Sequence, residues 1–96
     1  MVIENIKKVL IENKNKLEED FKVKEIGIFG SYIRGKQKKD SDIDILVEFS
    51  ESVSLLDVVK LESFLNLLLG IEVDVVPKQD IRRELKEQIL GEAVYV

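Results

Sequence analysis

Three aspartates in two strand-like segments are the residues of this sequence best suited to chemistry. Residues 42–49 alternate like a half-buried strand, which puts Asp42 and Asp44 on one face. Two carboxylates this close repel each other unless a cation lies between them, so the pair suits a hard divalent ion. Asp74 lies in a second, β-branched segment, residues 71–76. If the two strands are neighbours, Asp74 can stand next to Asp44 and add a third carboxylate.

A turn at Gly30 and Ser31 precedes the first aspartate pair. The apolar run 26–29 predicts a strand, and Ser31 is a natural N-cap for a short helix that contains Arg34. Such a turn points N–H groups and a hydroxyl outward, where they stabilise a phosphate. We therefore expect Gly30 and Ser31 to hold phosphate. Arg34 has two interpretations, which stay open: it reaches the phosphate, or it pairs with a carboxylate such as Asp40 and holds the loop.

The order of these residues resembles a known motif. Gly30-Ser31, ten further residues, Asp42-x-Asp44 and the later Asp74 are similar to the motif of the DNA polymerase β-type nucleotidyltransferase superfamily. The short chain resembles the minimal nucleotidyltransferase branch, which includes the antitoxins of toxin–antitoxin pairs whose toxin is a helical HEPN-domain protein. The resemblance covers residues 23–76 well. It departs from the usual form at Tyr32-Ile33, where Arg and Ala are common, and this bears on acceptor or base preference.

The resemblance implies a reaction and its cofactors. Asp42 and Asp44 would hold two Mg²⁺ ions, or Mn²⁺, that also bind the triphosphate of ATP or another nucleotide. Asp74 would join them on the ion nearer the attacking hydroxyl. Gly30 and Ser31 would hold the outer phosphates, with Arg34 as a weaker candidate. The implied activity is antitoxin action by transfer of AMP from ATP to a hydroxyl, expected to be a tyrosine, of a HEPN-type toxin.

Two other functions remain open from the sequence. One is a non-catalytic module that inhibits its partner by binding it through the leucine-rich segment and the C-terminal residues. The other is nucleotidyl transfer to a small molecule, which the isolated chain would have to catalyse without a protein acceptor. An intact set of three carboxylates weighs against a pure binding module, because a binding module has no need of close negative charges.

Composition narrows the available chemistry. The 96 residues predict a single domain, residues 1–96, and a hydrophobic content of 45% is that of a globular chain. The absence of Cys and His excludes disulfides, thiolate chemistry and imidazole ligands. A net charge of −4 argues against free nucleic acid as a partner. No secretory signal pattern or membrane-length apolar run is visible, so we expect a cytoplasmic protein without a membrane partner.

Periodicity predicts an α/β fold of the α+β kind. The expected helices are residues 3–20, a leucine-rich helix that Ser54 and Asp57 cap and Gly70 ends, and a last helix from Asp80 to Gly91. The expected strands are 21–29, 42–49 and 71–76, and the tail 93–96 is either a short extra strand or an apolar interface arm. A strand–helix–strand connection favours a parallel pair of the last two long strands, whereas the first two are expected to be antiparallel.

These elements predict a small mixed sheet of three to four strands flanked by helices. The helix after Ser54 carries more leucines than one sheet-facing side needs. The surplus either packs under the first or last helix or contacts a partner subunit, and we expect a homo-oligomer or a hetero-oligomer.

Overall fold

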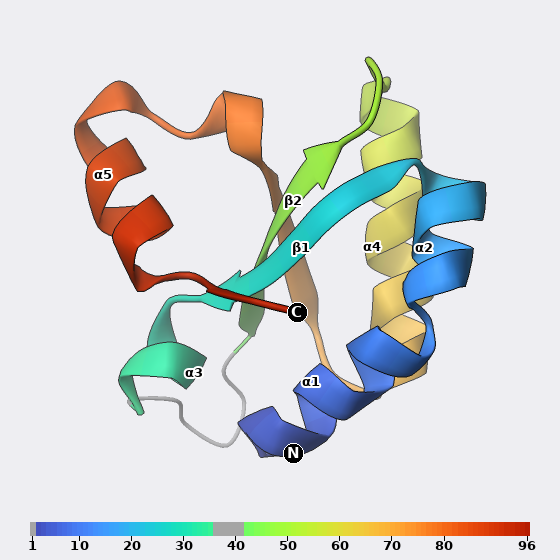
Figure 1. The fold of residues 1–96 in the computed structure, drawn as a ribbon, viewed down its shortest axis with the longest axis horizontal. Helices are drawn as coiled ribbons and strands as arrows, with labels where there is room; N and C mark the ends of the chain where they lie inside the picture. The colour runs from blue at the N-terminus through green and yellow to red at the C-terminus, as the bar shows by residue number, and fades with distance from the viewer. Residues whose placement is uncertain (1, 36–41) are drawn as a thin grey trace.

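The computed structural model describes residues 2–35 and 42–96 of the chain (Figure 1). A four-stranded mixed sheet in the order β3-β2-β1-β4 forms the centre. Figure 1 shows α1, α2 and α4 on one side of this sheet and α5 on the other. The elements are α1 (Ile3–Glu12), α2 (Lys14–Phe21), β1 (Val23–Phe29), α3 (Ser31–Arg34), β2 (Ile43–Phe49), α4 (Leu55–Leu69), β3 (Val73–Pro77), the 3₁₀ turn η1 (Lys78–Asp80), α5 (Arg83–Glu92) and β4 (Val94–Tyr95).

The strand directions agree with the prediction. β1 and β2 are antiparallel, β2 and β3 are parallel, and β4 adds an antiparallel edge to β1. On β2, Ile43, Ile45 and Val47 are fully buried and join the main core, as the alternation predicted. Leu46 is also buried, although it points to the opposite face with Asp44. Both faces of the central strand are therefore covered along part of their length.

The predicted helix 3–20 is two helices. Asn13 separates α1 from α2, and its side-chain amide donates to the carbonyl of Val9 at 2.8 Å. An amide side chain that bonds the preceding turn competes with helix continuation. The break falls in the Asn- and Lys-rich stretch 13–16, whose residues include poor helix formers.

The first strand begins two residues later than predicted. Phe21 ends α2 and stacks on Phe64 of α4, with ring centroids 4.8 Å apart. Lys22 then takes a left-handed conformation (φ 60°), and the N–H of Ser50 donates to its carbonyl at 2.8 Å. The aromatic contact keeps Phe21 helical, and the left-handed residue redirects the chain into β1.

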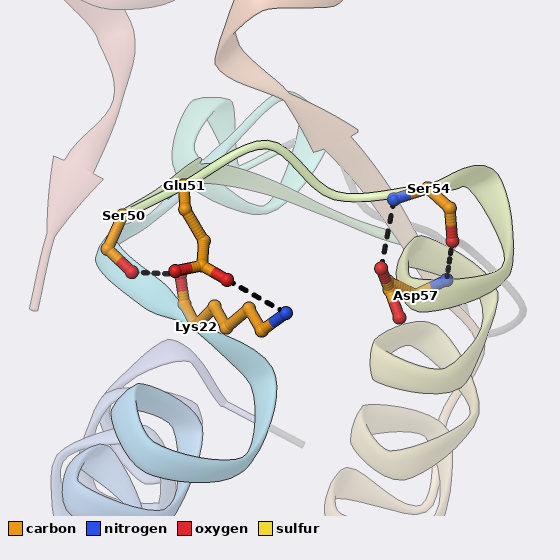
Figure 2. Close-up of polar contacts among 5 residues, drawn as sticks. All are labelled: Lys22, Ser50, Glu51, Ser54 and Asp57. Atoms are coloured by element: carbon orange, nitrogen blue, oxygen red, sulfur yellow. Dashed lines mark hydrogen bonds and ion pairs between the residues drawn. The ribbon is translucent and has the colours of Figure 1, made fainter.

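The start of α4 is the capping box that the sequence predicted (Figure 2). The N–H of Asp57 donates to Ser54 Oγ at 3.2 Å, and the N–H of Ser54 donates to Asp57 Oδ2 at 2.9 Å. Hydrogen bonding to its carboxylate by Ser54, first by the backbone N–H and then by the side chain, lowers the pKa of Asp57. Lys22 Nζ lies 2.9 Å from Glu51 Oε1, and this contact, drawn in Figure 2, raises the pKa of Lys22. α4 ends where predicted, at Gly70 in a left-handed conformation.

Leucines of α4 divide between core and solvent. Leu61, Leu65 and Leu69 recur every four residues and are buried against the sheet. A second set stays exposed, with Leu67 at 87% of its full accessibility, and consists of Leu55, Leu56, Val59 and Leu67. The interpretation in which all surplus leucines pack beneath neighbouring helices is therefore wrong for this chain.

The C-terminal third differs most from the prediction. β3 begins at Val73, whose N–H donates to the Asn66 side chain at 2.7 Å, and ends at Pro77. Asp80 does not cap the last helix, because residues 78–80 form η1 and α5 starts at Arg83. Gly91 does not end that helix, which runs to Glu92. The tail is an extra strand, β4, that pairs with β1.

Candidate functional site

A cavity of about 320 Å³ lies between the sheet and α5. The sheet contributes the carboxylates of Asp44 and Asp74, and the β1–α3 turn contributes Gly30. The other wall is one face of α5, because its lining residues recur at helical spacing. The complete lining is Phe29, Gly30, Asp44, Asp74, Val76, Leu85, Gln88, Ile89 and Glu92.

Parallel pairing of β2 with β3 brings two of the predicted aspartates together. Asp44 and Asp74 are register partners on adjacent strands, and both line the cavity. Side chains at matching positions of neighbouring strands point to the same face. Asp44 is half-buried and Asp74 is exposed. The predicted neighbourhood of these two carboxylates is confirmed.

Asp42 lies just before β2 and outside the cavity lining. It is exposed, and β2 begins at the next residue, Ile43. The structure therefore joins Asp44 with Asp74 directly and leaves Asp42 two residues outside them along the chain.

The Gly30 turn is shaped for close approach to Asp44. Gly30 has a φ of 81°, a conformation that residues with a side chain rarely adopt. A Cβ atom placed there would collide with the Asp44 carboxylate, whose Cγ would be 3.0 Å away. α3 starts at Ser31 itself, so Gly30 and not Ser31 holds the cap position. The side chains of Ser31 and Arg34, and the loop that contains Asp40, lie outside the described parts of the structure.

Glu92 is a site residue that the sequence reasoning missed. The N–H of Gly30 donates to Glu92 Oε1 at 2.7 Å, which joins two positions 62 residues apart. Reading Gly91 as the helix end had placed Glu92 outside the last helix. Continuing the helical spacing from Leu85 through Gln88 and Ile89 would have reached it.

Tyr32 has a structural explanation. Its side chain is 8% exposed and belongs to the main core, and Ile33 packs against that core. Both side chains therefore contribute to packing, and a link to acceptor or base preference stays a prediction.

The carboxylates of the cavity fit a divalent cation whose coordination shell a bound nucleotide would complete. Among the described residues, no three acidic side chains are arranged to hold a metal ion by themselves. Mg²⁺ commonly takes one or two carboxylates and fills its other positions with water and substrate phosphates. Asp44 and Asp74 supply such hard oxygen ligands on one face of the sheet, with Asp42 close by in sequence.

Comparisons with known proteins agree with this architecture. The model of a nucleotidyltransferase domain family matches residues 10–96. The protein adenylyltransferase MntA of Thermococcus cleftensis is 47% identical over 96 residues, which cover 100% of this chain and 97% of the relative. A solved structure described as a minimal nucleotidyltransferase superposes with a TM-score of 0.81 at 36% identity, covering 98% of this chain and 95% of that one.

A chain in a solved toxin–antitoxin complex is also similar. The complex contains a tri-AMPylated Shewanella oneidensis HEPN toxin and an MNT antitoxin, and the match has a TM-score of 0.64 at 29% identity. It covers 90% of this chain and 68% of the other. The family model over residues 10–96, together with these similarities, shows that the chain belongs to the nucleotidyltransferase family as a member of its minimal branch.

Proposed function

We propose that this chain is a metal-dependent protein adenylyltransferase that acts as an antitoxin by moving AMP from ATP to a hydroxyl of a HEPN-type toxin. The acceptor hydroxyl is expected to be a tyrosine. The observation that carries the proposal is the register pairing of Asp44 with Asp74 beside the Gly30 turn, in one cavity. The names of the relative MntA and of the AMPylated toxin complex support the acceptor class.

Two Mg²⁺ ions, or Mn²⁺, would neutralise charge on the triphosphate and lower the pKa of the attacking hydroxyl when bound. Asp42 and Asp44 would bind them, and Asp74 would add a ligand on the side of the acceptor. Gly30 and Ser31 would hold the outer phosphates, and Arg34 either assists them or pins the loop. Positioning and charge stabilisation of this kind provide most of the rate in phosphoryl transfer.

The small size of the cavity agrees with an acceptor on another polypeptide. A volume of about 320 Å³ lies at the lower end of ligand pockets.

Along the described parts of the chain, no helix is long and apolar enough to cross a membrane. We place the reaction in the cytoplasm, where ATP is available, with the toxin as partner and without a nucleic-acid or membrane partner.

A non-catalytic antitoxin that inhibits by complex formation is the second candidate. The observation that favours it is the exposed apolar set of α4, Leu55, Leu56, Val59 and Leu67. Binding and catalysis are compatible, since an enzyme that modifies a protein must also contact it. The difference between the two candidates is whether inhibition requires Asp44.

The test is transfer of label from α-labelled ATP to a purified HEPN-type toxin in the presence of Mg²⁺. Asp44→Asn and Asp74→Asn should each lower transfer by on the order of a hundredfold or more, since each removes a charged ligand. Glu25→Gln, which neutralises an exposed acid elsewhere on the sheet, should match the wild-type chain. Inhibition of the toxin by Asp44→Asn without labelling would support the binding module instead.

A further inference from the structure

Glu92 connects the last turn of α5 to the turn that precedes α3. Its carboxylate accepts a hydrogen bond from the Gly30 N–H at 2.7 Å in a partly buried setting. The carbonyl of Gly30 accepts from the N–H of Ile33. Both backbone polar groups of Gly30 are therefore engaged, one within the turn and one by a residue 62 positions away.

The backbone on either side of Glu92 is fixed independently of this bond. The N–H of Ala93 donates to the carbonyl of Ile89 at 2.9 Å, which continues the helical pattern past Glu92. Two residues beyond Glu92, Val94 pairs with Ile28 of β1, and Tyr95 pairs with Gly27. β1, which ends at Phe29 and leads into Gly30, thus also anchors the segment that carries Glu92, so Glu92 forms a fixed brace on the Gly30 turn.

Close approach between Gly30 and Asp44 makes this brace relevant to the site. A Cβ atom on Gly30 would collide with the Asp44 carboxylate, so a small rotation of the turn changes the space that this carboxylate occupies. We propose, on the basis of the AMP-transfer function above, that Glu92 is a positioning residue whose carboxylate oxygen holds the Gly30 turn against Asp44. It acts through Gly30, and the reach of its side chain, meaning its length, matters more than its negative charge.

Two conservative variants separate reach from charge. Glu92→Gln keeps the side-chain length and an acceptor oxygen but removes the negative charge. Glu92→Asp keeps the charge but shortens the side chain by one methylene, so it should not span the gap to the Gly30 N–H. Glu87→Gln removes an exposed acid from the same helix and serves as the control.

The experiment has two readouts on the full-length chain. One is the exchange rate of the Gly30 amide proton by NMR, and the other is the affinity for Mn²⁺ with a non-hydrolysable ATP analogue. Glu92→Asp should speed the exchange of Gly30 about tenfold or more. It should weaken binding of the analogue about tenfold, whereas Glu92→Gln and Glu87→Gln should stay within about threefold of wild type in both readouts.

Each of the following results would overturn the proposal. Equal weakening by Glu92→Gln and Glu92→Asp would show that the charge is needed as well as the reach, as for a direct metal ligand. Tighter binding by either variant would make Glu92 a competitor of the nucleotide. Unchanged binding by Glu92→Asp would remove its role in the site. Failure of the wild-type chain to bind the analogue would remove the AMP-transfer function as well, whereas the three preceding results leave that function standing. Should Glu92→Asp fail to fold, a change of more than about threefold in Glu92→Gln is sufficient to reject the claim.

Discussion

At the scale of single residues, the carboxylates define what this site can do. Asp44 and Asp74 are matched across adjacent parallel strands, and Gly30 leaves room for Asp44 because it lacks a Cβ. Like charges at paired strand positions destabilise a sheet unless a cation or a donor offsets them. The proposed metal, bound together with the nucleotide, would offset this repulsion.

Gly30→Ala tests the close approach at the turn. A φ of 81° should cost an alanine roughly 1–2 kcal/mol in the free energy of unfolding, and its methyl group would displace the Asp44 carboxylate. We expect lower stability in urea denaturation together with loss of AMP transfer. Gly91→Ala is the matched control, because Gly91 is helical and has open space at Cβ, so it should gain about 0.5–1 kcal/mol. Normal transfer by Gly30→Ala would show that the turn tolerates a methyl group.

Metal removal tests the role of the aspartates. ATP binding should require Mg²⁺ or Mn²⁺ and should be lost in EDTA, because without a cation the carboxylates repel the triphosphate. Isothermal titration of ATP into the chain, with and without EDTA, measures this directly. Equal affinity in the two conditions would count against a metal-assisted site.

At the scale of elements, α4 shows which local signals decide the structure. Its first turn is set by Ser54 and Asp57, its buried stripe by Leu61, Leu65 and Leu69, and its end by Gly70. Each of these signals acts on residues close to it in the sequence, so the boundaries of α4 follow from the sequence. The helix then supplies Asn66, which bonds the first residue of β3 and helps to align Asp74.

The capping box makes a prediction about pH. Hydrogen bonds from Ser54 lower the pKa of Asp57 below its ordinary value of 3.8, so the ionised carboxylate favours the folded state. This contribution is fully present above 3.8 and is lost as the pH falls through the lower pKa of the folded chain. Unfolding free energies of wild type and Asp57→Asn should therefore differ near neutral pH and converge in acid. A difference that grows on acidification would contradict the assignment.

Removing the cap itself should have a larger and less pH-dependent effect. Ser54→Ala loses the hydroxyl that accepts from the Asp57 N–H, and typical N-cap losses are about 1 kcal/mol. Urea denaturation at neutral pH measures it, with Ser52→Ala as the control in the preceding loop.

The two leucine sets of α4 should differ sharply in their effect on stability. Leu65→Ala opens a cavity in the core and should cost about 2–5 kcal/mol in the free energy of unfolding. Leu67→Ala removes an exposed side chain and should change the free energy little. Similar losses for both variants in isolated protein would mean that Leu67 is covered, for instance in a homo-oligomer.

At the scale of the whole molecule, the sheet decides which distant residues meet. The mixed topology, the pairing of Asp44 with Asp74 and the extents of β2 and α4 could all be predicted, because alternation, β-branching and capping signals agree there. The Gly30–Glu92 hydrogen bond could not be predicted from the sequence, because it depends on where α5 packs against the sheet. A glycine at position 91 suggested a helix end, but α5 runs through Glu92, and the N–H of Ala93 donates to the carbonyl of Ile89.

The most direct test of the account is the intact mass of a HEPN-type toxin co-expressed with this chain, as wild type and as Asp44→Asn. We predict a toxin heavier by one or more AMP units only with the wild-type chain, with the modification mapping to a tyrosine. An unmodified toxin that binds both chains equally would contradict adenylyl transfer and would leave the chain as a binding module.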